Sequence, residues 1–241
     1  MRLHAIQQVA FEGPGLIADW AAERGHTITT SLASDAAYPA CDDVDFLVIL
    51  GGPMDADDEA ANPWLHDEKH YVVECIAAGR AVLGVCLGAQ ILAEVLGGRV
   101  RRNEYKEIGW YPVTKTDAAG SERLLDGLPD TFVVGQWHGD TFELPGGLAP
   151  LLSSEACANQ AFLFDRRVLG VQFHIEWSER SLHSLIDACR DELGSGGLWT
   201  MSAREIEDEA PERIAGCREL LFALLDALAE EAALHAAARV Q

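Results

Sequence analysis

The sequence predicts an α/β fold: one domain with an open, mostly parallel, doubly wound sheet, flanking helices and extra C-terminal helices. Three observations predict this class. Strand patterns alternate with helix patterns through the first half of the chain. The run Asp45–Leu50 is apolar after its first residue, as expected for a parallel strand covered on both faces. No internal repeat and no long linker divides the 241 residues, which suffice for one substantial core.

The elements of the first half follow from local signals. Strands are expected where apolar or β-branched residues run together, at residues 3–9, 26–31, 45–50 and 81–85. Helices are expected between them, from Gly13-Pro14-Gly15 to about Arg24, from Pro63 to Gly79, and from Leu87 to Leu96. The turn Gly51-Gly52-Pro53 follows the third strand, and its glycines permit a close backbone approach or an unusual φ.

The second half becomes rich in β structure. Strands are expected at residues 98–102, 109–114, 131–136, 161–164 and 168–173. Ser178 caps a helix that reaches about Leu193. Ser202 and Glu205 form a capping box for a C-terminal helical region, which Pro211 restarts. This region carries an apolar stripe at Cys217, Leu220, Leu221, Leu224, Leu225 and Leu228.

The apolar stripe has two interpretations, because it can pack on the domain's own core or serve a partner. The first is the more economical, since no linker separates the helical region from the α/β part. We therefore expect residues 1–193 to form the α/β domain and residues 194–241 to form a helical extension packed on it.

Charge and composition exclude several classes. The formal net charge of −21 argues against a general nucleic-acid binder, because phosphate contacts need a cationic surface. One basic patch, Arg99, Arg101, Arg102 and Lys106, is either a solvated strand edge or a surface that attracts an anionic substrate or an acidic partner. No apolar run approaches the ~20 residues of a membrane span, and the N-terminus lacks a signal-peptide pattern. We expect a cytoplasmic protein with no membrane partner.

The cysteines include one that stands out. Six are scattered without a Cys-x-x-Cys pair, which predicts reduced thiols, most of them small buried hydrophobic residues. Cys86, however, lies at a strand-to-helix corner in Gly84-Val-Cys-Leu-Gly-Ala-Gln90. Unpaired amides and the positive end of the helix macrodipole favour a thiolate at such a corner. Cys86 is therefore a candidate nucleophile, and the alternative is a buried structural cysteine.

A thiol nucleophile needs a base and a group that orients the base. Gly170-Val-Gln-Phe-His-Ile-Glu176 provides both, because His174 and Glu176 follow an apolar strand and, two residues apart, project the same way from an extended segment. An oxyanion needs backbone donors, for which the amides of Leu87 and Gly52 are candidates. The alternative for Gly51-Gly52-Pro53 is a plain turn.

These motifs, with Glu107-Ile-Gly-Trp110 and Trp137-His-Gly-Asp140, resemble the class I (triad) glutamine amidotransferase family over roughly residues 44–177. The resemblance implies the flavodoxin-like fold of that family. It also implies that Cys86 attacks the side-chain amide of glutamine and that His174 passes a proton to the departing ammonia. Glu176 would orient His174, and water would hydrolyse the γ-glutamyl thioester.

The resemblance also implies further site residues. Gly52 and Leu87 would bind the oxyanion, while the glutamine moiety would be held by Gln90, Trp137, Gly139 and Asp140. Two positions depart from the family pattern. Ile175 stands where a proline usually separates the triad His and Glu, and Trp137 replaces a residue that is often small and polar, which permits a different γ-glutamyl substrate.

Three functions stay open. The first is a glutamine amidotransferase that makes ammonia, with a separate synthetase subunit as partner. The second is a stand-alone γ-glutamyl peptidase or hydrolase acting on glutathione-like γ-glutamyl amides, and the third is a catalytically silent binding protein on the same fold. No cofactor and no metal are expected. His66 and His70 have metal-ligand spacing, but His-Asp-Glu-Lys-His is not the zinc-protease pattern, so we interpret them as a solvated helix face.

Overall fold

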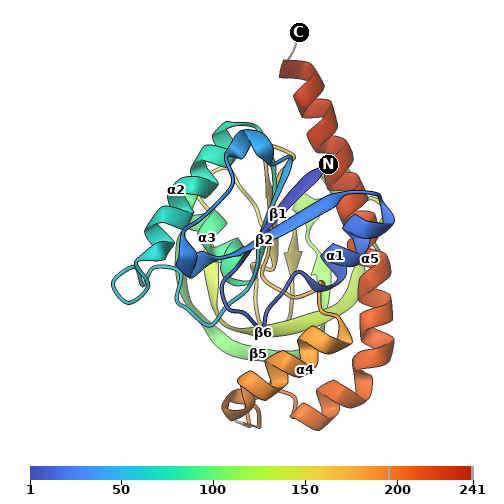
Figure 1. Ribbon diagram of the computed structural model, residues 1–241. Helices are drawn as coiled ribbons and strands as arrows, with labels where there is room; N and C mark the ends of the chain where they lie inside the picture. The colour runs from blue at the N-terminus through green and yellow to red at the C-terminus, as the bar shows by residue number, and fades with distance from the viewer. Residues whose placement is uncertain (195, 240–241) are drawn as a thin grey trace.

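A single mixed sheet organises the chain (Figure 1). The computed structural model describes residues 1–194 and 196–239, and within them the sheet has nine strands in the order β2-β1-β3-β4-β9-β8-β7-β5-β6. The strands are β1 (Arg2–Gln7), β2 (Thr27–Leu32), β3 (Phe46–Ile49), β4 (Ala81–Val85), β5 (Arg99–Lys115), β6 (Thr131–Glu143), β7 (Leu152–Ser153), β8 (Ala161–Phe164) and β9 (Val168–Val171). Ser195 and residues 240–241, at the edges of the expected extension, lie outside the described residues.

The sheet has a parallel half and an antiparallel half. Strands β2, β1, β3, β4 and β9 run parallel, and the pairs from β9 through β8, β7 and β5 to β6 are antiparallel. Five α-helices in the described residues flank the sheet: α1 (Gly15–Glu23), α2 (Trp64–Ala77), α3 (Leu87–Val95), α4 (Glu179–Ala188) and α5 (Ala203–Arg239). The predicted α/β class with an open sheet and flanking helices is confirmed.

The helices cover both faces of the sheet, so two cores form. Helices α1, α4 and α5 contribute to one core, and α2 and α3 contribute to the other (Figure 1). The apolar stripe of α5 packs into the same core as α1 and α4. Its residues at most 3% exposed are Cys217, Leu221, Leu224, Leu225 and Leu228. Among the described helices, none combines the length and the apolar character needed to cross a membrane.

Three expectations about elements are wrong. Strand β5 is one long strand instead of two, because a register shift between Arg102 and Glu107 takes up the polar middle while the residues on both sides of it pair with β6. Pro211 lies inside α5 and does not restart it, since buried residues on both sides, Ile206 and Ile214 among them, hold the helix on the core. Helix α4 ends at Ala188, and a 3₁₀ turn at Arg190–Glu192 follows it.

The cysteine expectation is also wrong in part. Cys41 and Cys75 form a disulfide, with Cα atoms 5.3 Å apart, whereas the other four are free. The sequence does not predict this disulfide, because 34 residues separate the two cysteines. Only the packed fold brings the turn at Cys41 beside the end of α2. Burial raises the pKa of Cys189 to about 11 and that of Cys217 to about 12, so these two stay as thiols at neutral pH.

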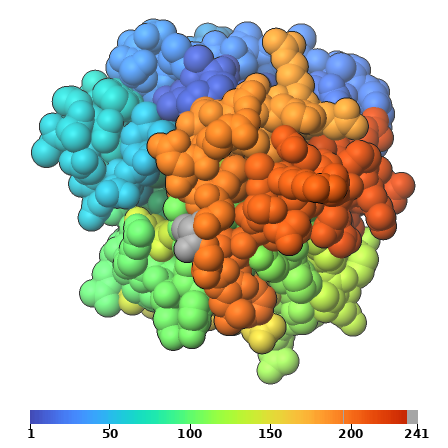
Figure 2. All heavy atoms as spheres, turned by 90° about the horizontal axis from the view of Figure 1, so that it is seen from below, coloured from blue at the N-terminus to red at the C-terminus, as the bar shows by residue number. Residues whose placement is uncertain are grey.

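The corner between β4 and α3 depends on glycine. A Cβ on Gly84 would lie 2.5 Å from the carbonyl oxygen of Gly88, and a Cβ on Gly88 would collide with the carbonyl oxygen of Ile49. The helix therefore approaches β3 and β4 more closely than any side chain would allow. This close approach places the start of α3 at the carboxyl edge of the sheet. Figure 2 views the molecule from below. In that view α4 and the segment after it lie between the N-terminal elements and the β5-β6 pair.

We expect Gly88→Ala to lower the free energy of unfolding by about 2 kcal/mol, because an inserted methyl group in a packed interior forces backbone to shift. Urea unfolding measures the change. Gly120→Ala is the matched control, because no atom lies within 4 Å of a Cβ at Gly120. Equal stability of Gly88→Ala and the wild type would contradict the close approach.

Candidate active site

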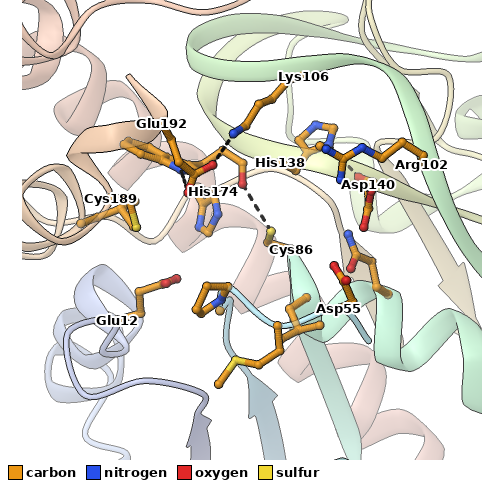
Figure 3. A pocket seen from close by; sticks show the side chains of 18 residues that line it. Glu12, Asp55, Cys86, Arg102, Lys106, His138, Asp140, His174, Cys189 and Glu192 are labelled. Atoms are coloured by element: carbon orange, nitrogen blue, oxygen red, sulfur yellow. Dashed lines mark hydrogen bonds and ion pairs between the residues drawn. The ribbon is translucent and has the colours of Figure 1, made fainter. Parts of the chain in front are cut away.

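A pocket of about 200 Å³ opens at the carboxyl ends of parallel strands, where open α/β sheets hold their ligands. Glu12 follows β1, Gly52 follows β3, Cys86 follows β4 and His174 follows β9, so four separate connections meet there (Figure 3). The residues that line the pocket are Glu12, Gly52, Pro53, Met54, Asp55, Cys86, Leu87, Gln90, Arg102, Lys106, Trp137, His138, Gly139, Asp140, His174, Leu185, Cys189 and Glu192.

Cys86 occupies a strained corner. It precedes α3 with φ 52° and ψ −108°, a backbone conformation that non-glycine residues rarely adopt. The side chain is only 7% exposed, and its Sγ lies 3.7 Å from the carbonyl oxygen of Trp137 and 3.7 Å from Nε2 of Gln172. The strained turn directs the thiol into the pocket (Figure 3), as a nucleophile elbow does for a serine.

His174 and Glu176 form a buried pair beside this thiol. His174 Nδ1 lies 2.7 Å from Glu176 Oε1, and both side chains are at most 5% exposed. The other carboxylate oxygen accepts a hydrogen bond of 2.9 Å from the amide of Ile175. A proline at position 175, as in the family pattern, would have no N–H to donate. Ile175 therefore supplies a hydrogen-bond donor that helps to hold Glu176 against His174.

The backbone and a neighbouring ring fix the orientation of His174. Its amide and carbonyl pair with those of Gly135 on β6, at 2.7 and 2.9 Å. Trp177 stacks on the imidazole with ring centroids 4.5 Å apart and an interplanar angle of 15°. The imidazole is therefore held in one plane before any substrate binds.

The electrostatics of His174 favour its charged form. Burial lowers the pKa of His174, but the carboxylate of Glu176 and then Cys86 raise it, and the result lies well above the ordinary range. An imidazole next to a cysteine thiol is the arrangement of cysteine enzymes that use histidine as base.

The two candidate oxyanion donors both line the pocket with the thiol. Leu87 is the first residue of α3, and the first amides of a helix lack intrahelical partners. Gly52 lies close by, because a Cβ on it would be 3.3 Å from Cδ2 of Leu87. The structure thus brings Gly52, Leu87 and Cys86 together in the lining of the pocket.

The four residues expected to hold the glutamine moiety also line the pocket. Gln90 comes from α3, just after the Cys86 corner. The other three, Trp137, Gly139 and Asp140, come from β6. Gln90 donates to Gln172 at 3.3 Å, and Asp140 forms an ion pair of 3.0 Å with Arg102. Of the nine site residues predicted from sequence, eight line the pocket, and Glu176 lies behind His174.

Sequence reasoning missed several charged residues of the pocket. Glu12, Asp55 and Glu192 were not singled out, nor was Cys189. The position of Glu12 just after the first parallel strand was a usable signal, because ligand-binding side chains gather at such ends. Cys189 and Glu192 gave no comparable signal, since their place depends on how the chain leaves α4.

The basic patch expected from sequence divides into two parts. Arg102 and Lys106 line the pocket, whereas Arg99 and Arg101 pair with Glu143. Lys106 forms an ion pair with Glu192. The patch is therefore neither one solvated edge nor one anion-binding surface.

A second polar cluster lies behind the pocket. Glu107, His138 and Cys157 are buried with their ligand atoms within 4.8 Å of one another. Glu107 is already engaged, because Ser154 Oγ, Gln160 Nε2 and His138 Nε2 all lie within 3.0 Å of its oxygens. The cluster is satisfied as a hydrogen-bond network that ties β5 to β6 and to the chain before β8.

Comparison with known proteins places these features in a family. The family model described as glutamine amidotransferase class-I matches residues 16–188. YfeJ, a glutamine amidotransferase-like protein of Salmonella typhimurium, is 34% identical over 198 residues, covering 80% of this chain and 83% of that protein. A glutamine amidotransferase from Thermotoga maritima has a similar crystal structure, with a TM-score of 0.87, 32% identity, and coverage of 95% of this chain and 98% of that one.

Matches to a larger enzyme are partial. A glutamine-hydrolysing GMP synthase of Edwardsiella ictaluri is 34% identical over 177 residues. The match covers 67% of this chain but only 31% of that enzyme. This chain therefore corresponds to about a third of such a synthase.

Removing the carboxylate of Glu176 tests the electrostatics of the pair. In Glu176→Gln the pKa of His174 falls, because burial still lowers it while the carboxylate that raised it is gone. Alkylation of Cys86 by iodoacetamide at pH 7 then slows, because the imidazole beside the thiol holds its positive charge less firmly. The NMR titration of the His174 ring measures the pKa directly. Glu212→Gln, on the exposed face of α5, is the control; an unchanged His174 pKa in Glu176→Gln would refute the assigned cause.

A buried carboxyl supports the Gly52 turn and gives a prediction about pH. A Cβ on Gly52 would lie 2.5 Å from Cβ of Gln8, whose Nε2 donates to Glu68 at 2.6 Å. Burial raises the pKa of Glu68 from 4.5 to about 7. As pH rises between these values, the unfolded chain releases this proton first, so the folded state loses stability, by about 3 kcal/mol in all.

Glu68→Gln removes this penalty while keeping an oxygen that accepts from Gln8. We expect it to raise the free energy of unfolding at pH 8 and to change it little at pH 4, where both states of the wild type hold the proton. Urea unfolding at the two pH values measures the difference. Glu74→Gln, exposed on the same helix, should have no such effect. A gain that is equal at both pH values would rule out the protonation argument.

Proposed function

The chain belongs to the class I glutamine amidotransferase family, and we propose that it hydrolyses the γ-amide of glutamine through a γ-glutamyl thioester on Cys86, releasing ammonia. One observation carries the proposal. A strained, pocket-facing thiol lies beside a buried imidazole that a carboxylate orients at 2.7 Å.

The first half of the reaction uses the thiol and the imidazole. Sγ of Cys86 attacks the γ-carbonyl carbon, and the carbonyl oxygen becomes an oxyanion next to the amides of Gly52 and Leu87. When the tetrahedral intermediate collapses, the C–N bond breaks and the nitrogen takes a proton from His174. Ammonia leaves, and the γ-glutamyl group remains on sulfur as a thioester.

The second half reverses the roles. His174, now neutral, takes a proton from water as the water oxygen attacks the thioester carbon. The C–S bond breaks, glutamate leaves and the Cys86–His174 pair returns to its first state. Glu176 holds the imidazole in place through both halves, and Gln90, Trp137, Gly139 and Asp140 hold the rest of the substrate.

The destination of the ammonia belongs to the same proposal. In the GMP synthases the matching segment is about a third of the enzyme, so ammonia production there is joined to a larger chain. By analogy, a separate synthetase subunit is the partner that would consume ammonia made here. Activity of the isolated chain that rises on adding that partner would support this arrangement.

The experiment is product analysis with glutamine. We expect the wild type to release ammonia and glutamate, and Cys86→Ser to be slower by on the order of 10³-fold or more, because removal of a nucleophile eliminates covalent catalysis. A glutamine-analogue electrophile should label Cys86 stoichiometrically. Cys217→Ser, at a buried thiol outside the pocket, is the control and should keep both activities.

Two outcomes would contradict the proposal. Undiminished turnover in Cys86→Ser would remove the thioester from the mechanism. Absence of both turnover and labelling under reducing conditions would favour a catalytically silent binding protein on this fold.

A further inference from the structure

The pocket has two sides, divided by Cys86 (Figure 3). On one side lie Asp55, Arg102 and Asp140, the last of which is assigned to the glutamine moiety. On the other side lie His174, Glu12, Cys189 and Glu192, with Lys106 above them. Since His174 gives its proton to the leaving nitrogen, the second side must receive the leaving group.

Glu12 lies directly beside the reacting atoms on the leaving-group side. A Cβ on Gly51 would lie 2.9 Å from Glu12 Oε2, 3.0 Å from Cε1 of His174 and 3.5 Å from Cβ of Cys86. The carboxyl group of Glu12 and the imidazole of His174 therefore both border the space above Gly51, next to the thiol of Cys86. A substrate whose amide nitrogen approaches His174 also brings the atoms beyond that nitrogen to Glu12.

Glu12 forms no salt bridge in the described part of the chain, and the one neighbouring charge that lowers its pKa is that of His174. Of the other acids of the pocket, Glu192 pairs with Lys106 and Asp140 pairs with Arg102 at 3.0 Å, while Asp55 lies beside these last two on the far side of the pocket from Glu12. No lysine or arginine among the described residues lies within ion-pair distance of Glu12, and its side chain makes no hydrogen bond there. Burial raises the pKa of Glu12 to about 7. A carboxyl group facing a cavity without a counter-ion is costly unless a ligand supplies the missing charge.

We propose that the enzyme also acts on γ-glutamyl amides whose leaving amine carries a second, positively charged group, and that Glu12 receives this charge. The inference rests on the thioester mechanism of the proposed function and adds a second substrate class to glutamine. In the cleavage step the amide C–N bond breaks, the nitrogen takes the proton of His174, and the distant ammonium group of the amine stays paired with Glu12. No other reactant is needed.

The same geometry disfavours anionic leaving groups. A leaving group with a carboxylate, such as the cysteinylglycine of a glutathione-like substrate, would place its negative charge near Glu12 and Glu192. Lys106 offers little compensation, because it is already paired with Glu192. The alternative substrate class considered from sequence is therefore the one that the pocket suits least.

The test compares three γ-glutamyl amides that differ in the charge of the leaving amine. They are the amides of a short diamine, of an alkylamine of the same length, and of glycine. We expect kcat/KM of the wild type to be about tenfold higher for the diamine amide than for the alkylamine amide, which corresponds to about 1.4 kcal/mol. The glycine amide should be the poorest of the three.

Glu12→Gln should abolish this ranking. We expect its ratio of kcat/KM for the diamine amide to that for the alkylamine amide to fall about tenfold, to near one. The alkylamine amide, measured in the same preparation, reports whether the variant is folded and active. Asp19→Asn, at an exposed carboxylate on α1, is the matched control and should keep the wild-type ratio.

The failures of the two proposals are distinguishable. Equal kcat/KM for all three amides in the wild type, or an equal loss on all three in Glu12→Gln, would overturn the role of Glu12 while leaving the thioester mechanism intact. No turnover of any amide or of glutamine, without labelling of Cys86, would overturn the proposed function as well.

Discussion

The close approach of α3 to β3 and β4 is the constraint on which the rest of the site depends. Two positions without side chains, Gly84 and Gly88, let the helix begin immediately after the strand. Cys86 must then adopt a strained backbone conformation to connect the two. The strain is maintained by packing of the whole helix, seven of whose nine residues are buried, so the thiol keeps its direction whether or not a substrate is present.

The catalytic centre could be predicted from sequence because its parts are encoded locally. Cys86 lies one residue from a strand end, and His174 and Glu176 lie within one short segment. The place of Glu192 in the pocket could not be predicted, because this residue lies in a 3₁₀ turn after α4 whose direction depends on packing. The same holds for the Cys41–Cys75 pair. Pro211 was misjudged for a related reason, since tertiary packing outweighed the local helix-breaking tendency.

Three buried acid–base groups differ in what offsets the free-energy cost of burying their charge. At His174 the unfavourable effect of burial is overcome by Glu176. At Glu68 it is met by protonation and one hydrogen bond from Gln8. At Glu12 burial likewise raises the pKa to about 7, but no hydrogen bond or salt bridge among the described residues engages the carboxyl group, and it faces a cavity. Only the last arrangement leaves an interaction for a ligand to complete, which is why Glu12 distinguishes itself from the other acids of a strongly acidic chain.

Helix α5 has a consequence for how the protein is made. It is the last element of the described chain, yet Leu221, Leu225 and Leu228 contribute fully buried surface to the core that begins with α1. Asp226 of α5 also accepts a hydrogen bond of 2.8 Å from the indole of Trp20. During translation, the part of this core that α5 covers therefore stays exposed until the ribosome has released α5, although α1 and α4 are already made. The nascent chain carries an adhesive apolar surface for most of its synthesis, and chaperone binding at that stage would protect this face.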